Sequence, residues 1–204
     1  MSALQLFGVA LLDTHAHEIV PPAPDTLVVA VRDLGAVVAA ADYDAPAPAD
    51  AALERYREVV DAVFVRGAVL PAPPGTVFRS RDLVVRWLEL HYHTLADGLA
   101  FVDERCEARV HIARRGLNGD PDDLATTAAE SVRALRRGAV AAVPLRADGR
   151  DERVVMRAAF LVERERWAAF RELVASEQQR HAGLEFRQTG PWPPYDFVRM
   201  QFGG

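Results

Sequence analysis

The sequence contains no lysine. All 24 of its basic residues are arginine, and 29 acidic residues outweigh them to give a formal net charge of −5 at pH 7. The abundance of Ala, Arg, Val and Pro favours a GC-rich codon bias as the origin of this absence, with arginine chosen for phosphate recognition as the alternative. The acidic balance argues against that alternative and against a protein that binds the nucleic-acid backbone.

Cysteine is almost absent as well. Cys106 is the single one, so no disulfide can form within the chain. Such scarcity is typical of the reducing cytosol. We expect Cys106 to be a buried, inert thiol, because reactive cysteines need an electropositive and partly exposed setting.

Long hydrophobic runs are also missing. The longest, such as residues 26–31, are far shorter than the roughly 20 residues that a membrane helix requires. The first residues lack the charged region and cleavage site of a signal peptide. Because half of the residues are hydrophobic, a packed core is expected. These features together predict a cytoplasmic protein without a membrane or nucleic-acid partner.

Residues 1–103 have the pattern of an N-terminal mixed α/β domain. The first apolar run is apolar on both faces, which is typical of a central, covered strand. Apolar residues at a spacing of three to four indicate two helices, for which Asp50 and Ser80 are suitable N-caps. The expected elements are strands at 4–12, 27–31 and 36–40, with a hairpin turn at 33–35, and helices at 51–64 and 80–99.

Residues 104–204 have the order β-α-β-α-β and predict a ferredoxin-like α+β domain. The expected elements are strands at 106–112, 154–162 and 184–189 and helices at 122–137 and 164–180, while 138–153 fits either a helix extension or a short strand. On the first strand, Glu107 alternates with apolar positions, so we expect a solvated carboxylate that pairs with Arg105 or Arg109.

Signatures of catalysis and of metal binding are weak. His15 and His17 have the spacing of two metal ligands, but a zinc site needs three or four, and a solvated loop is favoured. His91 and His93 lie two residues apart on an expected helix and do not share a face. Asp103, Glu104 and Glu107 have no accompanying nucleophile or base, and no phosphate-binding, zinc-protease or hydrolase motif is present. We predict no catalytic, cofactor or metal residues.

The end of the chain is its most informative stretch. Residues 189–198 read Thr-Gly-Pro-Trp-Pro-Pro-Tyr-Asp-Phe-Val. Prolines fix φ and push the preceding residue toward extended geometry, so a stiff, extended segment is expected, with Trp192–Pro193 as a candidate cis bond. The aromatic residues either close the second domain over its core or form a docking surface for a partner.

This stretch resembles the C-terminal signature of the gas vesicle protein F/L family. The residues that carry the resemblance are Gly190, Pro191, Trp192, Pro193, Pro194, Tyr195 and Phe197. A second segment, 70–78, is also similar through Leu70, Pro71, Gly75, Thr76, Val77 and Phe78, but it carries Pro73 and Pro74 where the family commonly has Arg and Phe. Glu107 matches a glutamate common in the family. A rigid loop joining two helices is the alternative interpretation of residues 70–78.

The resemblance implies a non-enzymatic accessory protein of gas vesicle assembly. It implies binding of the small hydrophobic shell protein, with other accessory proteins as further partners, and support of vesicle nucleation or growth. Two alternatives remain open at this stage. One is a ligand-sensing regulatory protein with a ferredoxin-like domain, and the other is an enzyme with a cleft between its domains.

Overall fold

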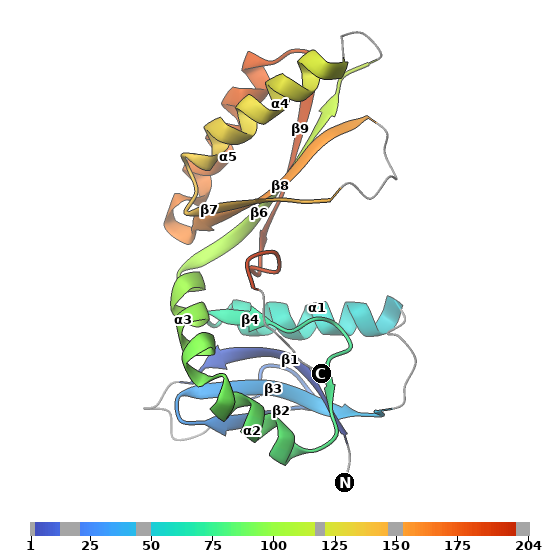
Figure 1. Ribbon diagram of the computed structural model, residues 1–204, viewed down its shortest axis with the longest axis vertical. Coiled ribbons are helices and arrows are strands. Elements are labelled where there is room, and N and C mark those ends of the chain that lie inside the picture. Colours follow the sequence, from blue (N-terminus) through green and yellow to red (C-terminus); the bar gives the residue numbers. More distant parts are fainter. Residues whose placement is uncertain (1–2, 13–20, 44–49, 117–120, 147–152, 199–204) are drawn as a thin grey trace. The chain divides into compact units, whose positions relative to one another are not determined.

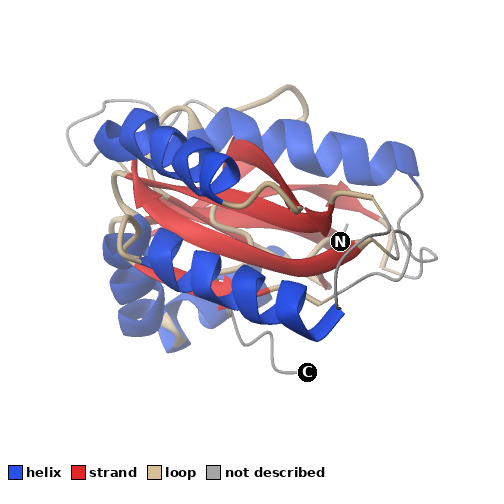
Figure 2. Ribbon diagram, turned by 90° about the horizontal axis from the view of Figure 1, so that it is seen from above, coloured by secondary structure: helices blue, strands red, loops and turns tan. Residues whose placement is uncertain are grey.

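The computed structural model describes residues 3–12, 21–43, 50–116, 121–146 and 153–198. The chain divides into two compact units, one formed by Met1–Glu104 with Pro193–Gly204 and the other by Arg105–Trp192. A five-stranded sheet lies in the first unit and a four-stranded sheet in the second (Figure 1). In both units helices lie against strands (Figure 2).

The sheet of the first unit is antiparallel and has its longest strand in the middle. Its strands are β1 (Ala3–Leu11), β2 (Thr26–Val31), β3 (Leu34–Ala41), β4 (Val69–Pro71) and β5 (Val77–Phe78). The order is β2-β3-β1-β4, and β5 also pairs with β1. The predicted central position of the first strand is therefore confirmed. The predicted hairpin is present too, but its turn is Arg32 and Asp33 and not residues 33–35, because Val31 faces Leu34 and β3 begins there.

Helices cover both faces of this sheet. On one face Tyr56 of α1 (Asp50–Phe64) stacks on Phe7, with ring centroids 6.3 Å apart. On the other face, Leu6 and its neighbours form a core with the buried residues of α2 (Arg81–Leu90) and α3 (Tyr92–Val102). The register of β1 shifts between Leu6 and Gly8, so that Val9 lies in the same core as Leu6 although three positions separate them.

One long helix was expected over 80–99, and two helices are found. Ser80 is the N-cap of α2 as predicted, since its Oγ accepts a hydrogen bond from the Leu83 amide at 3.3 Å. The helix is interrupted at His91, whose backbone adopts φ −103° and ψ 11° and whose Nδ1 lies 2.9 Å from the Trp87 carbonyl oxygen. The apolar spacing continues across His91 without proline or glycine, so the pattern contains no sign of the interruption.

The second unit is a ferredoxin-like sandwich, as predicted. Its elements are β6 (Arg105–Arg114), α4 (Pro121–Arg136), β7 (Ala141–Pro144), β8 (Val154–Glu163), a 3-10 turn (Arg164–Arg166), α5 (Trp167–Arg180) and β9 (Leu184–Trp192). The strand order β7-β8-β6-β9 is antiparallel throughout. Both helices pack on one face of this sheet (Figure 1). The ambiguous stretch 138–153 supplies β7, which forms an antiparallel pair with β8.

The last segment of the chain is grouped differently from the prediction. Residues 104–204 were expected to form one domain, whereas Glu104 and Pro193–Gly204 belong to the first unit. The reason is packing: Tyr195 lies against Tyr56, with ring centroids 6.4 Å apart, and Val198 packs against the core that contains buried residues of α2 and α3. The division of the chain into domains of residues 1–103 and 104–204 stays a prediction.

Candidate functional site

The residues predicted from the sequence fall into two groups, one in each unit. Glu107, Gly190, Pro191 and Trp192 lie on paired strands of the second unit. The others lie along one edge of the first sheet or in the terminal segment beside it, namely Pro71, Gly75, Thr76, Phe78, Pro193, Pro194, Tyr195 and Phe197.

The first group is organised by a bulge in β9, which we call the β9 bulge (Gly190–Trp192). Trp192 faces Glu107 and Thr189 faces Arg109, so β9 has one more residue than β6 between these pairs. Gly190 adopts φ +119°, and a Cβ placed on it would lie 2.6 Å from the Glu107 carbonyl oxygen. Glycine is therefore required at this position. The cis bond is Gly190–Pro191, and not the predicted Trp192–Pro193.

Glu107 is buried, contrary to the expectation of a solvated carboxylate. Its exposed fraction is 0%, and the predicted pairing with Arg109 is present, with Arg109 Nε donating to Oε1 at 2.7 Å. A charge-assisted hydrogen bond offsets part of the cost of removing the carboxylate from water. Alternation along a strand predicts which face a side chain occupies, but not whether that face is covered. Glu107 is therefore buried beside Arg109, and its role in partner binding stays a prediction.

Trp192 is the exposed aromatic residue of the β9 bulge. Its exposed fraction is 40%, and its indole N–H donates to Thr189 Oγ1 at 3.2 Å. Pro191 is exposed beside it, while Pro193 and Pro194 are buried. The predicted closure of the second domain is not found, because Pro193 and the residues after it belong to the first unit, and the docking role stays a prediction. Pro193 and Pro194 pack inside the protein, and Pro191 with Trp192 faces solvent.

In the first unit, residues 70–78 form part of the sheet edge and are not merely a connecting loop. Pro71 faces Gly8 and Phe78 faces Leu4, so β4 and β5 both pair with β1. Between them the chain turns at Gly75, whose φ is +83°. The turn is closed by Thr76, whose amide and hydroxyl both donate to the Pro73 carbonyl, at 3.1 and 2.7 Å.

The terminal segment packs on both sides of β4. On one side Tyr195 lies against Tyr56, whose hydroxyl donates to the Ala72 carbonyl. Burial, followed by the neighbouring Tyr195 hydroxyl, raises the pKa of Tyr56, so this donor stays neutral. On the other side Phe197 and Leu70 line an apolar pocket of about 350 Å³, together with Trp87, His91, Thr94, Leu95, Gly98, Phe101, Val102 and Val198.

Most of the residues that line this pocket are apolar, and His91 and Thr94 are among the polar ones. Within the described ranges, no three His, Cys, Asp or Glu side chains lie close enough to hold a metal ion. The predicted pair His15 and His17 lies outside those ranges. Cys106 is 1% exposed, and burial raises its pKa to about 11, against a smaller opposing influence of Arg164. The expected inert thiol fits this setting.

The second unit has two grooves that were not predicted from the sequence. One runs between α4 and the strands β7 and β8, with a volume of about 340 Å³. The other, which we call the α5–β9 groove, lies between α5 and the outer strand β9 and has a volume of about 470 Å³. Both border the outermost strands of the sheet. Strand order decides which strands are outermost, and no local signal in the sequence reports it.

Comparison with solved structures places this architecture among gas vesicle proteins. The crystal structure of GvpF from Anabaena sp. PCC7120 aligns over 100% of this chain and 99% of its own, with a TM-score of 0.80 and 17% identity. GvpF from Microcystis aeruginosa aligns over 98% of this chain and 100% of its own, with a TM-score of 0.76 and 14% identity. At these identities the likeness establishes the fold.

Sequence comparison adds the family. The family model described as gas vesicle synthesis protein GvpL/GvpF matches residues 18–118 and 121–199. Gas vesicle protein F2 of Halobacterium salinarum is 29% identical over 178 residues, which cover 86% of this chain and 81% of that protein, and gas vesicle protein F1 is 26% identical over 84% and 80%. The chain belongs to the GvpL/GvpF family of gas vesicle synthesis proteins, which confirms the resemblance seen in the terminal stretch.

The family description names gas vesicle synthesis and not a chemical reaction. Among the residues that the structure describes, no helix is long and apolar enough to span a membrane.

Proposed function

We propose that this protein is an accessory factor of gas vesicle assembly that binds the small hydrophobic shell protein and supports nucleation or growth of the vesicle. It acts in the cytoplasm, in association with the forming vesicle and with other accessory proteins. The observation that carries this proposal is the match of the GvpL/GvpF model to residues 18–118 and 121–199, which include both signature segments.

Physical considerations support a binding role. A shell subunit with a large apolar surface aggregates unless that surface or its free strand edges are covered. This protein offers surfaces suited to such a partner. Trp192 is an exposed aromatic residue on β9, an outer strand of the second sheet, and Leu27 is 41% exposed on β2, an outer strand of the first. Tryptophan is among the residues that contribute most to protein interfaces.

Co-purification of the shell protein with this protein tests the proposal. We expect capture by the wild-type chain and a loss of about tenfold or more in affinity on Trp192→Ala, since truncation of a central tryptophan costs about 2 kcal/mol or more. The matched control is Leu90→Ala, which removes a 79% exposed apolar side chain from α2. Absence of capture, together with intact vesicles in a deletion strain, would overturn the proposal. Equal capture by wild type and Trp192→Ala would overturn only the role of Trp192.

A further inference from the structure

The α5–β9 groove has the construction of a site for an added strand. It lies along the outer edge of β9, which pairs with β6 on its other side. Its walls include Trp167, Arg171 and Val174 from α5 and Phe186 and Gln188 from β9, and its volume is about 470 Å³. A groove between a helix and an outer strand is the setting in which several domains bind an extended peptide by strand addition.

At one end of this groove, the Gln178 side chain makes the backbone hydrogen bonds that a neighbouring strand would make. Gln178 Nε2 donates to the Leu184 carbonyl at 2.8 Å, and the Phe186 amide donates to Gln178 Oε1 at 2.8 Å. These two bonds also establish direction: the backbone groups of residues 184 and 186 point away from β6 and toward the groove. The side-chain amide of Gln178 therefore satisfies two of the backbone hydrogen-bonding groups on the outer edge of β9.

The next outward-pointing residue is Gln188. Backbone groups along an antiparallel strand alternate between its two edges, so the N–H and C=O of Gln188 face the groove as those of Phe186 do. Gln178 bonds only the Leu184 carbonyl and the Phe186 amide. In addition, the side-chain Nε2 of Gln188 is buried and has no acceptor among the described residues. An unsatisfied buried donor is costly, and a bound acceptor would remove that cost.

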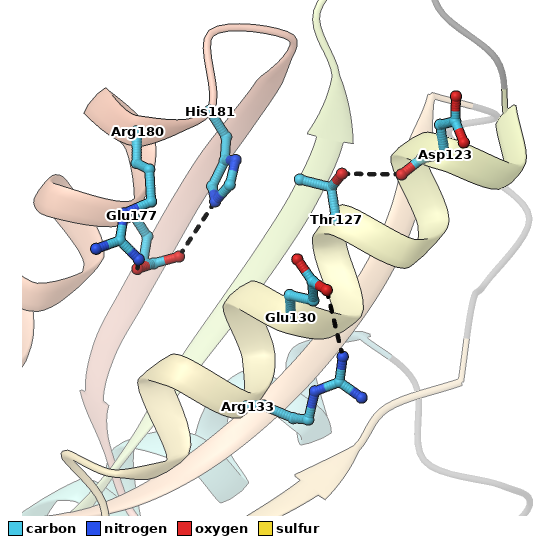
Figure 3. Close-up of polar contacts among 7 residues, drawn as sticks. All are labelled: Asp123, Thr127, Glu130, Arg133, Glu177, Arg180 and His181. Carbon is cyan, nitrogen blue, oxygen red and sulfur yellow. Dashed lines mark hydrogen bonds and ion pairs between the residues drawn. The ribbon is translucent and has the colours of Figure 1, made fainter.

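The charge of the groove indicates the chemistry of its occupant. Arg171 is the charged residue among those that line it, and its side chain is exposed and forms no ion pair with any described residue. The buried acidic residue of α5, Glu177, is already paired with Arg180 at 3.1 Å and lies 3.5 Å from His181 Nε2 (Figure 3). A carboxylate on the occupant is therefore complementary to Arg171.

We propose that the α5–β9 groove binds an extended peptide segment of a partner protein as a fifth strand on β9. A carboxylate side chain of the segment pairs with Arg171, an apolar side chain packs on Val174 and Phe186, and backbone groups bond the outer edge at Gln188. The proposal goes beyond shell-protein binding and does not depend on it.

Two synthetic octapeptides test this proposal on the full-length protein. Both are blocked at their ends and carry fluorescein, and one repeats Val-Val-Asp-Asp while the other repeats Val-Val-Lys-Lys, so that each face of the extended peptide carries both apolar and charged side chains. We expect the aspartate peptide to bind at least about tenfold more tightly by fluorescence anisotropy. This preference opposes the net charge of −5, which attracts the lysine peptide. Equal binding, tighter binding of the lysine peptide, or no binding would overturn the proposal.

Two pairs of variants locate the site. Arg171→Glu should abolish the preference for aspartate, whereas Arg137→Glu, the same charge change on an exposed residue outside the groove, should preserve it. Gln188→Pro removes the outward amide, and an outer strand tolerates proline where its N–H faces solvent. It should abolish binding without changing the circular dichroism spectrum, while Gln188→Ala, which keeps the amide, should weaken binding only severalfold. Unchanged affinity in Arg171→Glu or in folded Gln188→Pro would exclude this groove.

Discussion

At the scale of single residues, short distances between atoms restrict which side chain a position can hold. Gly190 allows the β9 bulge to pass the Glu107 carbonyl, and Glu107 is buried beside Arg109. The sequence predicted the pairing of Glu107 with arginine but placed its carboxylate in solvent. A period of two along β6 identifies the faces of the strand, whereas the burial of each face depends on distant residues.

Substitution of Gly190 by alanine tests the β9 bulge. The new Cβ would lie 2.6 Å from a backbone oxygen at φ +119°, so we expect a loss of about 2 kcal/mol or more in the free energy of unfolding. Urea denaturation measures it. Gly183→Ala is the matched control, because the nearest atom to its Cβ lies at 3.6 Å, and it should cost about 0.5 kcal/mol or less. Equal effects would contradict the steric explanation.

The reactivity of Cys106 tests its burial. Its pKa is raised from 9.0 to about 11, so the native state favours the neutral thiol. The resulting contribution to stability is complete below the unfolded pKa and is lost as the pH rises toward the folded one. We expect almost no alkylation by iodoacetamide in the native state at a pH of about 8, and rapid alkylation in concentrated urea.

An exposed cysteine provides the reference rate for this experiment. Ala182 is exposed in the turn before β9, so Ala182→Cys in a Cys106→Ala chain should be alkylated at the same rate with and without urea. Native alkylation of Cys106 at that reference rate would show that the thiol is accessible.

At the scale of elements, periodicity predicted most helices and strands, and errors arose where side chains interact with the backbone. Ser80 begins α2 as its type predicts. The interruption at His91 was missed, because the apolar stripe continues into α3 while a ring nitrogen contacts the Trp87 carbonyl. Gln178, a polar residue in an amphipathic helix, likewise gave no sign that it bonds the edge of β9.

Removal of the Gln178 amide tests how α5 is attached to β9. Gln178→Ala deletes two side-chain hydrogen bonds, to Leu184 and Phe186, and should lower the free energy of unfolding by about 1–2 kcal/mol. Urea denaturation of the variant measures this change, with Gln179→Ala, an exposed neighbour on the same helix, as the control. Equal stability of the two variants would show that water replaces the bridge without cost.

At the scale of the whole molecule, the chain leaves the first unit after Glu104 and returns to it at Pro193. The first unit is thus built from two separate stretches of sequence, and the second from one. A boundary near residue 104 is visible in the change of pattern. The return is not visible, because Val198 packs on a core whose other members all lie between Leu4 and Val102, and Tyr195 lies against Tyr56.

Truncation after Trp192 tests this organisation. The terminal segment contributes Tyr195 beside Tyr56, and Phe197 and Val198 beside Leu70. Without it, we expect faster amide hydrogen exchange in α1 and β4 and unchanged exchange in β6 and β8, measured by mass spectrometry. Tyr195→Ala should reproduce part of the effect in α1, and Trp192→Ala should not. Loss of protection in β6 and β8 instead would assign the segment to the second unit.

Most elements and their order, the hairpin of the first sheet, the ferredoxin-like succession and the terminal signature of the GvpL/GvpF family can all be predicted from the sequence. These features depend on local spacing and on residue identity. Long-range packing, in contrast, determines which strands are outermost, the burial of Glu107, the return of the chain to the first unit at Pro193, and the groove between α5 and β9. Each of these depends on pairing between residues far apart in the chain, which local periodicity does not encode.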